Sequence, residues 1–245
     1  MGAFLLAAAA QADTNRTPVE LYKWAGKSGG IVHLRDLNGS IKVGPSADGQ
    51  LHVLATAWQK DGGDPMTVQV VRKEAGDHVT FCVLWPAKAT TCEAQGEYGH
   101  DGTVKNGGRV RVDLEVQLPR GASIDAETTN GHVSVDAQAT RVSAATVNGN
   151  VEIKAGAGPM AAQSVNGDVR VKIAGAGGDA VLLETVNGDV EVAAATGELV
   201  ASTVNGGVEV DGQRLGRSAR HQLGGKGDRS IRAETVNGRI RVATR

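Results

Sequence analysis

Two acidic residues at equivalent places in successive repeats of the sequence are its clearest pair for acid–base chemistry. Asp168 and Asp189 each follow an Asn-Gly pair. Glycoside-cleaving enzymes use such paired carboxylates, one as the acid and the other as the base or nucleophile. A sugar ring would also need an aromatic platform, and no aromatic residue follows Tyr98. We therefore expect Asp168 and Asp189 to be solvated surface acids, and we assign no catalytic residue.

A basic segment near the C-terminus is the second candidate for chemistry. Between Arg214 and Arg232 the chain has seven Arg, Lys or His residues and a single acid, Asp228. Such a cluster attracts anionic envelope polymers or lipids. A solvated surface excursion of ordinary charge is the alternative interpretation. The residues proposed to bind an anionic ligand are Arg214, Arg217, Arg220 and Arg229.

Other motifs with a known chemistry are incomplete or missing. Gly26-Lys27-Ser28 resembles the end of a phosphate-binding loop, but Leu21 stands where that loop begins with glycine. The sequence has no H-E-x-x-H or G-x-S-x-G motif, and its six histidines are scattered singly. We expect no cofactor and no metal, and a net charge of −1 gives no reason to expect nucleic-acid binding.

Two cysteines, Cys82 and Cys92, lie ten positions apart with Trp85-Pro86 between them. No second Cys or His pair has the spacing of a metal site. In an oxidising compartment the two thiols would pair across a hairpin-like loop. We predict a disulfide that stabilises the protein by about 2–3 kcal/mol.

The element that must position all these residues is a repeat built on Asn-Gly. The pairs begin at residues 38, 130, 148, 166, 187, 205 and 237, and from 130 onward the steps are 18, 18, 21, 18 and 32 residues. Each copy continues as an alternation of apolar and polar residues, which is a strand pattern. A short, nearly constant period is typical of a repeat architecture.

Two structures fit this pattern, namely stacked β-hairpins and a β-solenoid. We favour an all-β fold with a β-solenoid of the single-stranded parallel β-helix kind, because a narrow Val/Ala core needs no aromatic residues. Stacked coils would place Asn148, Asn166, Asn187 and Asn205 above one another as an amide ladder. They would also pair Arg170 with Glu152 and Glu191, whereas Glu191 beside Glu209 would be unfavourable.

The Asn-Gly pairs are expected to form the structural corners of the coils. We expect a positive φ at Gly149, Gly167 and Gly188, and hence a loss of about 1–3 kcal/mol in Gly188→Val. The corner residues are Asn148, Gly149, Asn166, Gly167, Asn187, Gly188, Asn205, Gly206, Asn237 and Gly238.

The chain divides into three expected regions. Residues 1–12 have the apolar run and A-x-A ending of a signal peptide, and we expect this peptide to be truncated at its start because no Lys or Arg precedes the run. Residues 13–120 form an N-terminal β-rich region, which contains every Trp and Tyr, and residues 121–245 form the repeat solenoid. The last copy, Thr235 to Val242, is expected to be the end coil, where Arg239 and Arg241 would repel an identical end.

The order of these motifs resembles a known family. An early "LNGSIKV", a "FCVLWP…C" segment, a strand closed by "LPRG" and serial "TVNGDVEV" units are similar to the adhesin-like β-strand-repeat family of exported bacterial proteins, a domain of unknown function. The resemblance covers most of residues 30–245, and it implies an exported β-repeat domain without catalytic residues to carry over. The spacing between Asn205 and Asn237 departs from the regular pattern.

These observations favour a non-catalytic exported protein with a structural or adhesive role in the bacterial cell envelope, periplasmic or on the cell surface. The alternatives are a polysaccharide-acting β-helix enzyme and an envelope-stress regulatory module that binds a membrane partner. The expected partner is an anionic envelope polymer or another envelope protein, bound by a monomer or weak oligomer through the basic C-terminal end, with a strong dependence on salt.

Overall fold

The computed structural model describes residues 18–27, 30–59, 62–87, 89–101, 109–155, 158–173, 179–224 and 228–244. The predicted signal peptide, residues 1–12, lies outside these ranges. Throughout the described ranges the chain is built of strands and one short 3-10 helix, η1 (Pro65–Thr67). None of these residues forms a helix with the length and apolar character to cross a membrane.

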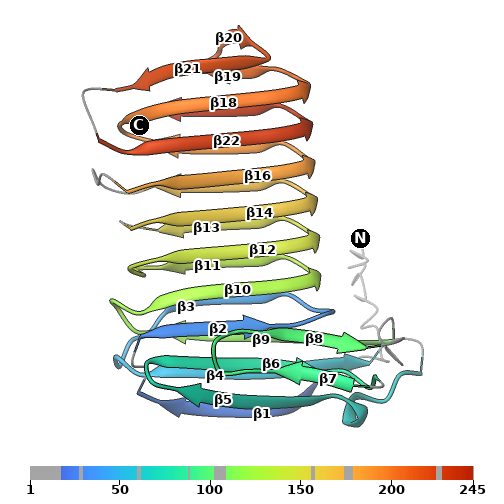
Figure 1. Ribbon diagram of the computed structural model, residues 1–245. Helices are drawn as coiled ribbons and strands as arrows, with labels where there is room; N and C mark the ends of the chain where they lie inside the picture. Colours follow the sequence, from blue (N-terminus) through green and yellow to red (C-terminus); the bar gives the residue numbers. More distant parts are fainter. Residues whose placement is uncertain are drawn as a thin grey trace, which may run out of the picture.

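Two large sheets face each other and make up almost the whole molecule (Figure 1). The first sheet contains, in spatial order, β1 (Val19–Gly26), β4 (Leu51–Gln59), β9 (Val110–Leu118), β3 (Ile41–Pro45), β11 (Val133–Ala137), β13 (Val151–Ala155), β15 (Val169–Ile173), β17 (Val190–Ala194), β23 (Ile240–Thr244), β19 (Val208–Val210) and β20 (Gln213–Gly216). The second contains β21 (Ser218–Leu223), β18 (Gly197–Asn205), β22 (Ser230–Asn237), β16 (Val181–Asn187), β14 (Met160–Asn166), β12 (Val142–Asn148), β10 (Ser123–Asn130), β2 (Ile31–Arg35), β6 (His78–Leu84) and β5 (Gln69–Ala75).

Each repeat copy makes one coil with two strands, one in each sheet, joined at its Asn-Gly corner. The coils β10–β11, β12–β13, β14–β15 and β16–β17 stack in parallel, and equivalent residues stand in register, as with Val151 beside Val169. This arrangement confirms the β-solenoid, and the alternative of stacked hairpins is wrong because strands joined by an Asn-Gly pair lie in different sheets.

The core lies between the two sheets and is filled by small aliphatic side chains. Alternate residues of every repeat strand point inward, and residues such as Ala144, Val151 and Ile153 are at most 1 % exposed. The alternation of apolar and polar residues therefore sets the inward and outward faces. A core of this width holds Val, Ala, Ile and Leu without aromatic residues, as the sequence predicts.

The last repeat of the sequence is not the last coil in space. Strands β22 and β23 lie between β16–β17 and β18–β19, so the copy at 235–242 fills a slot one coil below the end (Figure 1). The expectation that Thr235 to Val242 forms the end coil is wrong. The long step from Asn205 to Asn237 contains β20 and β21, which pair antiparallel with β19 and β18 and end the stack before the chain returns.

The opposite end of the stack is finished by antiparallel strands and aromatic side chains. The coil β2–β3 lies between β6 and β9 on one side and β10–β11 on the other, and β4, β1 and β5 add antiparallel strands beyond. Tyr22 and Trp24 on β1 pack against buried Phe81, with ring centroids 6.1 and 5.6 Å apart. The N-terminal region and the repeat region therefore share both sheets.

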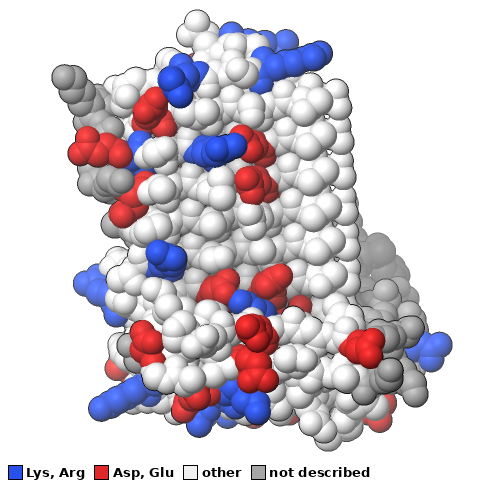
Figure 2. Space-filling model, in the orientation of Figure 1, with Lys and Arg blue, Asp and Glu red and all other residues white. Residues whose placement is uncertain are grey.

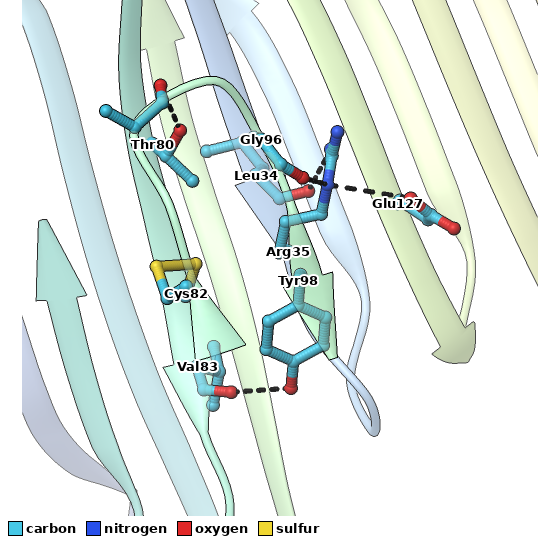
Figure 3. Close-up of a disulfide and its surroundings, with 10 residues drawn as sticks. Leu34, Arg35, Thr80, Cys82, Val83, Gly96, Tyr98 and Glu127 are labelled. Carbon is cyan, nitrogen blue, oxygen red and sulfur yellow. Dashed lines mark hydrogen bonds and ion pairs between the residues drawn. A yellow bond between two sulfur atoms is a disulfide. The ribbon is translucent and has the colours of Figure 1, made fainter. Parts of the chain in front are cut away.

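A disulfide fixes a flap on the outer surface of this end. Cys82 and Cys92 are bonded, with Cα atoms 6.2 Å apart, which confirms the predicted pair. The flap contains the hairpin of β7 (Ala89–Cys92) and β8 (Tyr98–Asp101). Figure 3 shows the Thr80 hydroxyl and the Tyr98 hydroxyl, which bond the carbonyls of Ala94 and Val83 at 2.7 and 2.8 Å.

Candidate functional site

The corner of each coil is held to the coil before it by the first residue of the T-V-N-G motif. The Thr146 hydroxyl donates to the carbonyl of Gly131 at 2.9 Å, and Ser164 donates to that of Gly149 at 2.8 Å. Every corner from β10 to β18 has this contact, which is also made by Thr128, Thr185, Thr235 and Thr203. The hydroxyl residue thus satisfies a glycine carbonyl at a bend in the chain.

The corner glycine is required by close stacking and not by its φ angle. A Cβ atom built on Gly149, Gly167 or Gly188 would lie 1.9–2.1 Å from the carbonyl oxygen of the glycine in the preceding coil. The φ angles of these glycines lie outside the left-handed region, so the expected positive φ is wrong. Gly206 and Gly238 have the same close contact, at 1.8 and 1.9 Å.

The corner asparagines form an amide ladder along the stack. In each rung an Nδ2 group donates to the Oδ1 atom of the neighbouring asparagine at 2.7–2.9 Å. The order in space is Asn130, Asn148, Asn166, Asn187, Asn237 and Asn205, so Asn237 separates the two residues expected to be neighbours. Asn, Gly and Thr together make this edge of the molecule regular over six coils.

The second residue of the motif, valine, produces an exposed apolar column beside the asparagines. We call this column the valine strip; it consists of Val147, Val165, Val186, Val236 and Val204 on the outer face of the second sheet. These side chains are 39–57 % exposed, and Met66 is the only other large apolar side chain so exposed among the described residues. Contiguous exposed apolar surface on a soluble protein often marks an interaction site.

The valine strip borders a shallow trough of about 550 Å³. Its other wall contains Glu127, Gln163, Glu184 and Glu234, and its floor contains the corner hydroxyl residues such as Thr185. Figure 2 shows an uncharged surface along the right side of the stack, where the strands of the second sheet end, and charged side chains of both signs toward the centre. The trough offers methyl groups on one side and hydrogen-bond acceptors on the other.

The outer face of the first sheet is covered by ion pairs instead. Arg170 contacts Asp168 at 2.6 Å and Glu191 at 3.3 Å, and Arg241 contacts Asp189 and Glu191, each at 3.0 Å. Since β23 lies between β17 and β19, Arg241 separates Glu191 from Glu209. The facing pair Arg170–Glu191 is as expected, whereas Glu152 pairs with Lys154 at 2.8 Å. Asp168 and Asp189 are thus engaged by arginines.

The four arginines proposed to bind an anion do not form one surface. Arg214, Arg217 and Arg220 are exposed on β20, β21 and the residue between them, and Arg220 contacts Glu198 at 3.3 Å. Arg229 is only 1 % exposed, so it is part of the interior and unable to meet a ligand. Figure 2 shows basic side chains gathered at the top of the stack, around β20 and β21.

A buried polar cluster under the disulfide flap was not expected from the sequence. His33 Nδ1 lies 2.9 Å from Asp125 Oδ2, and its Nε2 lies 2.9 Å from His78 Nδ1. Arg35 donates to Asp125 and to the carbonyl of Gly96, and Figure 3 shows the contact with Gly96. Burial raises the pKa of Asp125, but the hydrogen bond from His33 and the charge of Arg35 outweigh it and hold this pKa at about 2. The cluster could have been found only from the register between coils, which places His33 beside Asp125.

Asp36, at the start of the first corner, is a second buried carboxyl group, and its hydrogen bonds come from neutral groups. Its Oδ1 atom accepts hydrogen bonds from the backbone of Leu37 and Asn38 and from the Trp85 indole. Burial raises the pKa of Asp36 to about 7, although these hydrogen bonds oppose the shift. Within the described ranges, no three His, Cys, Asp or Glu side chains come together as metal ligands.

Comparison with known proteins places this architecture among related folds. A family model described as Toastrack DUF4097 matches residues 104–243. The crystal structure of a putative cell adhesion protein from Clostridium sporogenes aligns with a TM-score of 0.53 at 10 % identity, covering 94 % of this chain and 100 % of that one. A putative adhesin from Bacteroides fragilis aligns with a TM-score of 0.35 at 12 % identity, covering 92 % and 97 %. No curated protein matches the sequence.

Proposed function

Because the chain belongs to the Toastrack DUF4097 family, a β-repeat family, we propose that it is a non-catalytic exported protein with a structural or adhesive role in the bacterial cell envelope. The stack supplies a rigid scaffold, and the valine strip with its trough supplies the binding surface. The likeness to a solved structure described as a putative cell adhesion protein supports the fold.

The valine strip is the observation that carries this proposal. Its five side chains are 39–57 % exposed, so apolar surface faces water along the length of the strip. Burying what remains exposed would contribute about 3–6 kcal/mol to the binding of a partner. The strip stands on coils fixed by the glycine, threonine and asparagine contacts, so a partner would meet a surface that is already ordered.

Export is supported by two features of the chain. The apolar run ending in Ala10-Gln11-Ala12 has the pattern of a signal peptide. The Cys82–Cys92 disulfide is of the kind that persists in the periplasm or outside the cell. The absence of catalysis is supported by the state of Asp168 and Asp189, whose carboxylates contact arginines and so are not poised as an acid and a base.

A sedimentation assay with purified envelope material tests the adhesive role. We expect the wild-type protein to cosediment and Val165→Glu/Val186→Glu to lose most of this binding, because both changes place a charge in the strip. Ala193→Glu/Ala243→Glu is the matched control, since it adds the same charge on the outer face of the first sheet. Equal loss in both variants, or no binding by the wild type, would contradict the proposal.

Localisation and catalysis have separate tests. Cell fractionation of the full-length protein should place it outside the cytoplasm, with Cys82 and Cys92 oxidised in the recovered protein. Incubation with envelope polysaccharide should release no new reducing ends. Release that disappears in Asp168→Asn or Asp189→Asn would instead establish the enzyme.

A further inference from the structure

The copy of the repeat at residues 235–242, which we call the inserted repeat, lies one coil below the end of the stack. A cavity of about 310 Å³ opens in the coil above it, at the corner that precedes β19. Three glycines and three arginines line most of it. The lining residues are Gly206, Gly207, Val208, Glu209, Arg214, Gly216, Arg217 and Arg239. The cavity therefore combines the corner between β18 and β19, both strands β19 and β20, Arg217 just after β20, and the corner between β22 and β23.

The cavity exists because this coil has glycine where other coils have a side chain. The residue after Asn-Gly is Asn150, Asp168, Asp189 or Arg239 in the coils below, and Gly207 here. A Cβ atom on Gly207 would have only the Gly216 carbonyl within 4 Å, at 3.7 Å. The place of the missing side chain is thus open space that a side chain would fill.

The same position breaks a ladder of hydrogen bonds. In the coils below, each backbone N–H after the corner donates to the side chain of the preceding coil: Asp168 to Asn150, Asp189 to Asp168 and Arg239 to Asp189, at 2.7–2.9 Å. The coil under Gly207 presents Arg239, and a guanidinium has donors only. The N–H of Gly207 therefore has no side-chain acceptor beneath it, at the point where the cavity opens.

The charge around the cavity is positive. Arg217 is held in place by its own carbonyl, which accepts a hydrogen bond from the N–H of Thr203 at 2.8 Å. Across the described part of the chain, neither Arg214 nor Arg217 takes part in an ion pair, and Arg239 only approaches Asp189, at 3.7 Å. Glu209 is the single acid of the lining, and it stands opposite Arg214 in the register of β19 and β20.

We propose that this corner cavity binds a phosphoryl group, held by Arg214, Arg217 and Arg239 and by the N–H of Gly207. Donors that converge from three arginines and the backbone suit a tetrahedral dianion, whereas a carboxylate is satisfied by one forked arginine. The site replaces the broader basic surface expected from the sequence. It is independent of the valine strip, which lies on the other sheet, so either can fail without the other.

Titration of the full chain with inorganic phosphate at constant ionic strength, followed by amide NMR, tests the site. We expect a saturable shift of the Gly207 amide, about tenfold weaker binding in Arg217→Ala, and no saturable shift in Arg214→Ala/Arg217→Ala. Arg141→Ala removes the same charge from an exposed position elsewhere and should leave the affinity unchanged. Shifts that do not saturate, or an equal effect of Arg141→Ala, would overturn the proposal.

Gly207→Asp is the sharper variant, because it restores the residue type that Asp168 and Asp189 provide in other coils. It should keep the thermal midpoint of the wild type, fill the cavity with a negative charge and abolish phosphate binding. A folded Gly207→Asp protein that binds phosphate like the wild type would overturn the site. If this variant does not fold, the exposed Arg217→Ala variant still decides the matter.

The source of the phosphoryl group is distinguished by two further titrations. If the site recognises a phosphate-containing polymer, a glycerol-phosphate oligomer should bind at least as tightly as inorganic phosphate. The oligomer should also compete with inorganic phosphate for the site. Vesicles containing phosphatidic acid, compared with phosphatidylcholine vesicles, test a lipid headgroup. Binding to either that persists in Arg214→Ala/Arg217→Ala would show that the cavity is not the site of contact.

Discussion

Each end of the stack must cover the open face of its last coil, and the two ends do so with different side chains. At each end the chain lays down an outer layer first and then returns to fill a coil beneath it: β6 and β9 follow β4 and β5, and β22–β23 follow β18–β21. The N-terminal end is closed by Tyr22, Trp24 and Phe81 and by a disulfide-bonded flap. The C-terminal end is closed by two short antiparallel strands and no aromatic residue.

The difference shows what each end can do. The aromatic rings and the flap bury charged and ionisable side chains at the N-terminal end, including Asp36 and Arg35, and so shield them from water. The short strands β20 and β21 leave arginines and backbone in contact with water at the other end. An open sheet edge invites another strand, and antiparallel end strands with charged side chains reduce that hazard at both ends.

Gly238→Ala should have the largest effect on this comparison, because it acts on the inserted repeat. A Cβ atom at 238 would lie 1.9 Å from the carbonyl of Gly188, and neither backbone can yield without separating two coils. We expect a loss of about 3 kcal/mol in the free energy of unfolding, measured in urea. Gly44→Ala is the control, since nothing lies within 4 Å of its Cβ position, and a similar loss there would contradict the close-stacking explanation.

A pH series should separate the two ends through Asp36. Its pKa is raised from 3.8 to about 7, mainly by burial, so between these values the folded protein keeps a proton that the unfolded chain has released. Stability should therefore fall as pH rises through this window, by about 2–4 kcal/mol, and then level off.

Asp36→Asn is the control for the pH series, because it keeps the acceptor for Leu37, Asn38 and Trp85 but cannot ionise. Urea midpoints measured at about pH 4.5 and about pH 8 should differ less in this variant than in the wild type. Hydrogen exchange should place the change in β2, β6 and β9 and not in β18–β22. If the difference between the two urea midpoints is the same in Asp36→Asn as in the wild type, another ionisable group is responsible for the dependence on pH.

Replacing both cysteines should loosen only the flap end. Cys82→Ser/Cys92→Ser removes a short closed loop, and we expect a loss of about 2–3 kcal/mol in the free energy of unfolding. Amides of β7, β8 and β6 should exchange faster, and those of β18 and β22 should be unchanged. Faster exchange throughout the stack would mean that the two ends unfold as one unit.

The smallest effect should come from the asparagine ladder. Asn237 donates to Asn187 and accepts from Asn205, whereas Asn205, in the last coil, makes only the contact with Asn237. Asn237→Ala should cost about 1 kcal/mol and Asn205→Ala about half of that, because these amides are exposed. Equal costs, measured by thermal melting, would contradict the inserted position of the last repeat.

The repeat motif predicts the fold because each of its residues does one local task. The alternation in Val151-Glu152-Ile153 fixes the inward face, and Asn148-Gly149 fixes the corner, so strands, sheets and the amide ladder follow from the sequence. The reason for the glycine did not follow, because it depends on a neighbouring coil: the carbonyl that excludes a Cβ from Gly149 belongs to Gly131.

The order of the coils was missed, although the charges indicated it. Read along the chain, Glu191 would lie beside Glu209. Read with the last repeat inserted, the column runs Glu152, Arg170, Glu191, Arg241 and Glu209, with alternating sign at every step. The cluster of His33, Arg35 and Asp125 was missed because it needs the register between segments about ninety residues apart.

The inserted repeat also determines how the molecule would respond to a pulling force. The last described strand, β23, is hydrogen-bonded to β17 on one side and to β19 on the other. Tension there cannot peel an outer strand away, because it must break two ladders of hydrogen bonds together. We expect single-molecule stretching from this end to show one high rupture force followed by easy release of β18–β21, and a gradual unpeeling from the C-terminus would contradict this view.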